Sequence, residues 1–177
     1  MINNSYNKSK HKNIFFQPKI LYPFILLFLT FLDGSIPAHF FSLTINPSLT
    51  LIFIFYLIFF SGYKKFNFNL WVFLIGLIFD LYYTEILGIY LVSFSLSTYF
   101  LYQIKKKALT NFFLKLLILL IVSILFYIMF YICSKIGNQI NFNFFFFLIS
   151  NILPNSFFNI IIGAIFYKPF ENLMKES

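Results

Sequence analysis

The sequence predicts an all-α integral membrane protein, folded as a compact bundle of six transmembrane helices. The first observation behind this fold class is composition: 60% of the 177 residues are hydrophobic, 24% are aromatic and only 10% are charged. A soluble domain of this length cannot keep so much apolar surface away from water. The second observation is that 12 of the 13 lysines fall in alternate gaps around six apolar stretches, which places them on one side of the membrane. The bilayer is therefore the expected solvent.

The basic residues, all of them lysines, also predict the topology. Of 13 lysines, only Lys135 falls on the second side of the predicted helices. The others are Lys8, Lys10, Lys12, Lys19, Lys64, Lys65, Lys105, Lys106, Lys107, Lys115, Lys168 and Lys175. Because the cytoplasmic flanks of membrane helices carry the excess of Lys and Arg, we expect six crossings with both termini inside. The net charge of +8 is then explained by topology and contacts with anionic lipid, and no nucleic-acid partner is expected.

A helix that crosses about 30 Å of hydrocarbon needs about 20 residues, and somewhat shorter helices are tolerated. Apolar runs near this length predict the first five spans at Ile20–Ile36, Ile45–Gly62, Asn67–Tyr83, Ile86–Ile104 and Phe112–Cys133. The chain then divides into a polar cytoplasmic tail (1–19), a membrane domain (20–170) and a short cytoplasmic C-terminal tail (171–177).

The last apolar region, Phe142–Phe170, contains the interruptions Asn151, Pro154 and Asn155. Two separate crossings here would place the C-terminal lysines outside, which the charge pattern opposes. We therefore expect 142–153 to form an outer-leaflet or re-entrant helix and Pro154 to open the sixth span, since proline fits a first helical turn. The alternative is one kinked helix through the whole region.

The N-terminal lysines, the short apolar run and Ile36-Pro37-Ala38 together also resemble a secretory signal with a cleavage site. Such sites need small residues at positions −3 and −1, and Ile36 does not fit. Asp33 also interrupts the approach to the site. An uncleaved membrane anchor is therefore favoured.

Two acidic residues within the predicted spans, Asp33 and Asp80, are the first candidates for a functional site. Both lie toward the outer ends of odd-numbered helices. One interpretation is that they are hydrated end residues or N-caps of the next element. The other is that they bond to Asn159, Asn151 or Ser and Thr groups inside the bundle.

Asp80 is the stronger candidate because Gly76 lies one turn before it on the same helical face. A glycine there lets a neighbouring backbone approach closely. Gly88 follows a tight turn at the start of the fourth span, so the third and fourth helices should form an antiparallel hairpin; it can also be merely a turn residue.

Sequence motifs for catalysis or metal binding are absent. There is no HExxH motif, no phosphate-binding glycine loop and no second cysteine beside Cys133. His39 has no suitably spaced partner and is more typical of a surface or interface residue. We therefore expect no catalytic, cofactor or metal site, and no enzyme.

The run Phe73–Leu81 (FLIGLIFDL), followed by Ile86–Ile89 (ILGI), resembles the signature of the bacterial rod shape-determining MreD family. The segment Leu153–Asn159 (LPNSFFN) is similar to the proline-centred start of the family's last helix, with an asparagine shortly after it. Asp33-Gly34 resembles the Gram-positive branch. Chain length, basic flanks and short spans agree with the same family.

The resemblance implies a non-enzymatic, multi-pass component of the cell-elongation machinery in the plasma membrane, which helps to organise peptidoglycan synthesis. The implied partners are a single-span MreC-like protein, the actin-like MreB and peptidoglycan synthases. The candidate residues for packing or partner docking are Asp33, Gly76, Asp80, Gly88, Pro154 and Asn159.

An alternative function is that of a substrate-binding membrane subunit, similar to the S subunits of vitamin transporters, which are also six-helix proteins. Such a protein should line a pocket near its outer face with polar groups. The sequence offers Asp33, Asp80, Glu85, Asn151 and Asn155 for this purpose. Against it, the first helix has no AxxxA-type stripe of small residues for docking to an energising partner.

Overall fold

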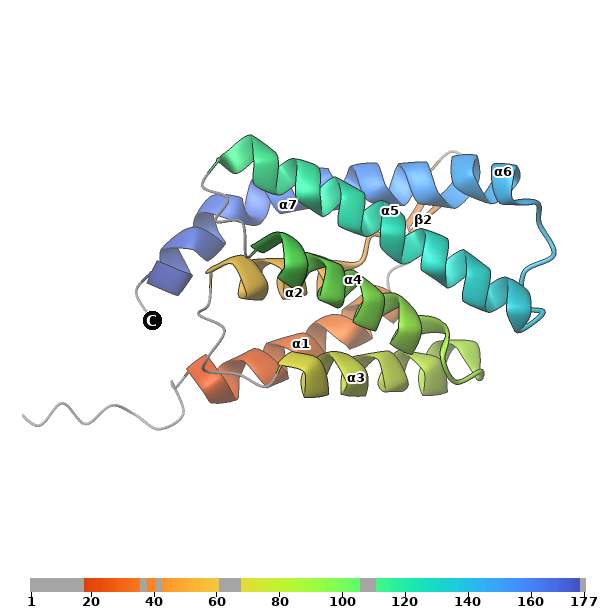
Figure 1. Cartoon of the computed structure of the whole chain (residues 1–177), viewed down its shortest axis with the longest axis horizontal. Helices are drawn as coiled ribbons and strands as arrows, with labels where there is room; N and C mark the ends of the chain where they lie inside the picture. Colours follow the sequence, from red (N-terminus) through yellow and green to blue (C-terminus); the bar gives the residue numbers. More distant parts are fainter. Residues whose placement is uncertain (1–17, 36–37, 41–42, 61–67, 106–110, 176–177) are drawn as a thin grey trace, which may run out of the picture.

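The computed structural model describes residues 18–35, 38–40, 43–60, 68–105 and 111–175. The helices in chain order are α1 (Pro18–Ser35), α2 (Leu49–Phe60), α3 (Phe68–Phe79), η3 (Asp80–Thr84), α4 (Ile89–Lys105), α5 (Phe112–Ile136), α6 (Phe144–Phe147), η4 (Leu148–Ile152) and α7 (Leu153–Lys175), where η3 and η4 are π-helical. As Figure 1 shows, α1 and α3 form one edge of the bundle, α5 and α7 the other, and α2 and α4 lie between them.

Helix α2 forms the centre of the bundle and contacts α1, α4 and α7. Its residues 50–58 are all buried. A helix that is apolar on every face belongs in the interior of a protein, where no side must meet water or lipid. The helix begins at Leu49, four residues later than the predicted span, because Asn46-Pro47-Ser48 precedes it in a non-helical conformation.

The expected all-α architecture has one small exception between α1 and α2. There the strands β1 (Ala38–Phe40) and β2 (Leu43–Ile45) form an antiparallel hairpin in which His39 pairs with Thr44. Three-residue strands are too short to show the alternating pattern by which strands are recognised in a sequence. Strand β2 also contacts η4 and α7, so the hairpin packs against the last helix.

The prediction of a re-entrant helix before the last span is wrong. Helices α6, η4 and α7 form one continuous helix that begins at Phe144, and its candidate membrane span, Phe144–Asn172, is 29 residues long. Pro154 lies inside it and does not open it. Because proline lacks an N–H and its ring clashes with the carbonyl four residues earlier, the wide π-turns of Leu148–Ile152 accommodate Pro154 without ending the helix.

Two helices in the described part of the chain are long and apolar enough to cross a membrane, Phe112–Ile136 and Phe144–Asn172. Shorter apolar helices are Tyr22–Asp33, Leu49–Phe60 and Asn69–Thr84. The count of six crossings therefore stays a prediction from the lysine pattern. The tail 1–17, the last residues 176–177 and residues 36–37 of the alternative cleavage site lie outside the described residues.

Candidate functional site

Asp80 caps the helix that follows it. Its carboxylate accepts hydrogen bonds from the backbone N–H groups of Gly88 and Tyr90, both at 2.7 Å, and of Leu91 at 3.3 Å. The first N–H groups of any helix lack partners within the helix and carry its positive dipole end. A fully buried carboxylate at the end of one helix therefore satisfies the start of the next. This is the geometry of the N-cap interpretation.

The turn between α3 and α4 depends on Gly88. Its φ is +114°, a conformation that residues with a Cβ rarely adopt. The same conformation directs the Gly88 N–H to the Asp80 carboxylate. The glycine is thus needed for the turn and also for the cap.

At Gly76 the backbones of α3 and α4 approach each other closely. A Cβ added to Gly76 would lie only 2.5 Å from the Cα of Leu91. The predicted close approach of a neighbouring backbone is therefore present, and the neighbour belongs to the same chain. Gly76 is buried in this contact and does not itself lie on an exposed surface.

Asp33 repeats the arrangement of Asp80 one hairpin earlier. From the end of α1, its carboxylate accepts hydrogen bonds from the N–H groups of Leu49 at 2.8 Å and Thr50 at 2.9 Å, and from the Ser48 hydroxyl at 3.3 Å. Ser48 Oγ in turn accepts the N–H of Leu51 at 3.2 Å. Each of the first two helical hairpins is therefore closed by an aspartate at the end of its odd helix.

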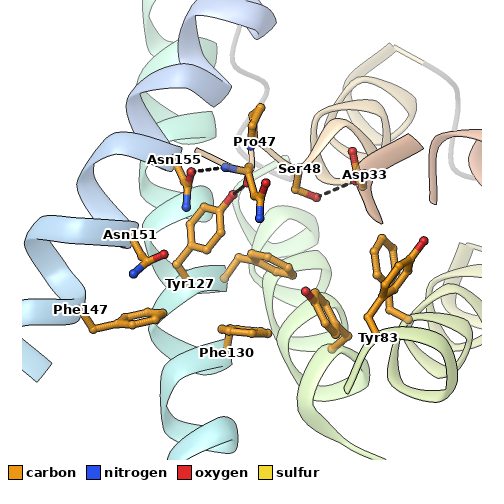
Figure 2. A pocket seen from close by; sticks show the side chains of 13 residues that line it. Asp33, Pro47, Ser48, Tyr83, Tyr127, Phe130, Phe147, Asn151 and Asn155 are labelled. Carbon is orange, nitrogen blue, oxygen red and sulfur yellow. Dashed lines mark hydrogen bonds between the residues drawn. The ribbon is translucent and has the colours of Figure 1, made fainter. Parts of the chain in front are cut away.

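The segment before α2 is also held from the opposite edge of the bundle. The N–H of Asn46 donates to Asn155 Oδ1 on α7 at 2.7 Å, and the Tyr127 hydroxyl on α5 donates to the Asn46 carbonyl at 2.8 Å (Figure 2). Asn46 thus links α2 to both α5 and α7. Sequence reasoning did not find Asn46 or Tyr127, because these contacts join residues 109 and 81 positions apart.

These elements line a half-open cavity of about 210 Å³, shown in Figure 2. We call it the capped-helix cavity, since the Asp33 cap of α2 lies at its rim. Its lining residues are Asp33, Asn46, Pro47, Ser48, Phe79, Tyr83, Tyr90, Phe126, Tyr127, Phe130, Phe147, Asn151 and Asn155. Asp80 is not among them. The cavity combines aromatic walls with one carboxylate and several amides and phenols.

Asn159 lies apart from both aspartates. It is fully buried, and its side-chain amide donates to the Ser123 hydroxyl of α5 at 3.2 Å, while its Oδ1 has no hydrogen-bond partner among the described residues. Asn151 donates to Ser150 Oγ at 2.9 Å. The hydrogen bonds of Asp33 and Asp80 thus go to backbone and serine groups at the helix ends, not to these asparagines.

The opposite end of the bundle is organised by lysines and by a glycine that sequence reasoning missed. Lys105 Nζ donates to the carbonyl of Ile58 near the end of α2, so α2 carries an acidic cap at its start and a basic group at its end. Lys115 donates to the Tyr167 hydroxyl at 3.0 Å.

Gly163 accepts a hydrogen bond from Tyr56 at its carbonyl and packs against Leu119. The signal for this contact was the small pair Gly163-Ala164 within a bulky helix.

Within the described ranges, no group of three or more His, Cys, Asp or Glu side chains could hold a metal ion. The Cys133 thiol is free. The His39 side chain lies outside what the structure describes.

Comparison with known proteins gives one match. A family model described as rod shape-determining protein MreD matches residues 12–177. Neither a curated protein nor a solved structure matches the chain.

Proposed function

Because the chain belongs to the MreD family of rod shape-determining proteins, we propose that it is a membrane scaffold that holds proteins of the cell-elongation machinery together. The family consists of non-enzymatic cell-shape components of the bacterial inner membrane and is part of the MreBCD shape system. The family match over nearly the whole chain is the observation that carries the proposal. An MreC-like single-span protein, an MreB-like protein and peptidoglycan synthases are the proposed partners.

The proposed topology has six crossings with both termini inside the cell. The arrangement of charge around α2 supports it. Asp33 lies at the start of α2 and Lys105 at its end, so acidic and basic groups separate toward opposite ends of the bundle. In a membrane the basic end faces the cytoplasm. The MreB-like partner then meets the end that carries Lys105 and Lys115, and Asp33 and strand β1 lie at the outer rim.

The surface proposed for the MreC-like partner is formed by α3 and α4. A groove of about 240 Å³ between these helices is lined by Asn69, Val72, Ser95, Thr98, Tyr99 and Tyr102. We call it the α3–α4 groove. The Thr98 hydroxyl is buried and has no hydrogen-bond partner in the described part of the chain. Small and hydroxyl-bearing side chains are favourable contacts between helices in a membrane, so the groove suits a partner helix that packs against Ser95 and Tyr99.

Co-purification with the MreC-like protein from membranes tests this proposal. Ser95→Leu, which fills the groove, and Tyr99→Ala should both lower recovery of the partner. Phe145→Ala is the matched control, because Phe145 and Tyr99 have similar exposed fractions, 71% and 63%, and Phe145 lies on α6. Depletion of the protein should round or swell the cells without stopping peptidoglycan polymerisation by isolated enzymes. Equal recovery with all three variants would refute docking at the groove.

The second candidate function, a solute-binding transporter subunit, rests on the capped-helix cavity. Its polar groups fit the expectation for such a protein. Its volume of about 210 Å³ is smaller than the roughly 300–1,000 Å³ of most small-molecule sites. The scaffold function is therefore preferred. Submicromolar binding of a vitamin-sized ligand by the purified protein, with rescue of depleted cells by that nutrient, would reverse this preference.

A further inference from the structure

The capped-helix cavity carries negative charge without a neighbouring cation. Asp33 is its only acidic residue, and no Lys, Arg or His is among its lining residues. The α2 N-terminus compensates this charge only in part, because a helix dipole is equivalent to about half a charge. The carboxylate has about four lone-pair directions, of which three are used by Ser48, Leu49 and Thr50. The cavity is thus suited to a cation and unsuited to an anion.

Many of the residues that line the cavity are aromatic. Phe79 and Tyr90 stack with 4.8 Å between ring centroids, and Tyr90 and Phe130 are 5.0 Å apart. Tyr83, Phe126, Tyr127 and Phe147 complete the aromatic lining. Aromatic faces attract organic cations through the ring quadrupole, and the attraction grows when water is excluded. Aromatic walls around one carboxylate are the chemistry that recognises an ammonium group.

Two further acceptors in the lining are unused. Within the described residues, the hydroxyl of Tyr90 makes no hydrogen bond. Asn151 uses its amide as a donor to Ser150, which leaves Oδ1 available. Each of these oxygens, like the remaining lone pair of Asp33, can accept a hydrogen bond from an ammonium group in the part of the cavity that it lines.

The volume limits the size of the ligand. At about 210 Å³ the cavity holds several waters or one small organic group, since most drug-sized ligands occupy sites of roughly 300–1,000 Å³. Ethanolammonium and trimethylammonium groups are within this limit. The cavity also lies at the ends of α1 and α3 and the starts of α2 and α4, the level at which helix ends meet lipid headgroups.

We propose that the capped-helix cavity binds a small organic ammonium group, supplied by an aminolipid headgroup or by a free amine. Asp33 provides the charge, Tyr90 and Asn151 provide acceptors, and Phe130 is part of the aromatic wall. This site is independent of docking at the α3–α4 groove, none of whose residues lines the cavity.

Binding is measured on the full purified chain in phosphatidylglycerol nanodiscs, with glycerophosphoethanolamine and tetramethylammonium as probes and glycerol phosphate as the anionic control. Both ammonium probes should bind saturably and glycerol phosphate should not. Asp33→Asn should weaken binding by about tenfold or more, since it removes the charge. Glu85→Gln is the matched control: it neutralises an exposed carboxylate in the turn between α3 and α4 that does not line the cavity, and should change affinity less than about twofold.

A second pair of variants keeps the test valid if Asp33→Asn does not fold. Phe130→Leu should weaken binding of tetramethylammonium, whereas Phe145→Leu, on the exposed face of α6, should not. Nanodiscs that contain phosphatidylethanolamine then identify the source. If the probes no longer bind in these nanodiscs, the lipid headgroup occupies the cavity and is the ligand. If probe binding is unchanged, the ligand is a free amine. No saturable binding of either ammonium probe, or equal binding by wild type, Asp33→Asn and Phe130→Leu, would overturn the proposal.

Discussion

The carboxylate of Asp80 accepts a 2.7 Å hydrogen bond from the N–H of Gly88, and the backbone of Gly88 has a φ of +114°. This one contact fixes the end of α3, the turn and the start of α4. Asp33 makes the corresponding contact with Leu49 between α1 and α2. The two aspartates therefore act within the chain, where each positions a helical hairpin.

Because Asp80 caps α4, we expect substitutions of Asp80 to lower the thermal stability in proportion to the number of acceptors that they remove. Asp80→Asn keeps the shape and one acceptor oxygen, whereas Asp80→Leu removes every acceptor and leaves three N–H groups near the start of α4 without their bonds. Each buried unsatisfied group costs about 1–3 kcal/mol. Asp80→Leu should therefore lower the midpoint of thermal unfolding in detergent more than Asp80→Asn. If Asp80→Asn abolished cell-shape function at a normal membrane level, the charge itself would be required and the capping account would be insufficient.

Substitution by alanine should lower the free energy of unfolding by different amounts at Gly76 and at Gly163. In Gly76→Ala the new Cβ meets the backbone of Leu91, which cannot move without shifting α4. In Gly163→Ala it meets the end of the Leu119 side chain, which can change rotamer. Gly76→Ala should therefore be the more destabilising, by about 1–3 kcal/mol as for overpacking in a close-packed core. Thermal unfolding of both variants measures the difference, and a larger loss for Gly163→Ala would contradict the placement of Gly76.

The contact between Gly76 and Leu91 also affects how a loss of partner binding in a Gly76 variant should be interpreted. Gly76 was expected to help form a docking surface, and its contact with Leu91 places it inside the chain. A Gly76→Leu variant that loses the partner could simply have lost the α3–α4 packing. Variants in the α3–α4 groove are the cleaner test of docking.

The buried pair Ser123 and Asn159 predicts a non-additive effect on stability. Ser123→Ala leaves the amide of Asn159 without its hydrogen bond and should cost about 1–3 kcal/mol. The double variant Ser123→Ala with Asn159→Leu removes both polar groups and should recover part of that loss. A double-mutant cycle by thermal unfolding measures the coupling between the two residues. Strictly additive losses would contradict a structural role for this hydrogen bond.

The lysine pattern predicts which positions face the cytoplasm. In a Cys133→Ser background, single cysteines placed at Lys106 and Lys175 should resist an impermeant thiol reagent in intact cells and react after permeabilisation. A cysteine at Lys135, the exceptional lysine, should react in intact cells. Labelling of position 106 or 175 from outside would refute the six-crossing topology.

Much of the fold was predictable because it depends on local signals. Apolar runs located the helices, and the Gly-x-x-x-Asp spacing of Gly76 and Asp80 followed by Gly88 indicated the hairpin of α3 and α4. The continuous last helix was not predicted, because Pro154 normally marks a helix start and the π-turns that retain it have no sequence signal.

The cavity could not be predicted from the sequence for a different reason. Asp33 was identified as a candidate, but its neighbours in space come from five other parts of the chain. The link from Asn46 to Asn155 spans 109 residues, and no local pattern records such a contact. A single sequence shows which residues are unusual, whereas their convergence depends on packing.

We propose that the protein acts by holding an elongation partner through the α3–α4 groove. Docking there is tested most directly by a photo-crosslinking residue placed at Tyr99 in growing cells, with the same residue at Phe145 as the control. We expect a crosslink from Tyr99 to the MreC-like single-span protein that is lost with Ser95→Leu. A crosslink of equal yield from Phe145, or none from Tyr99 in cells of normal shape, would contradict it.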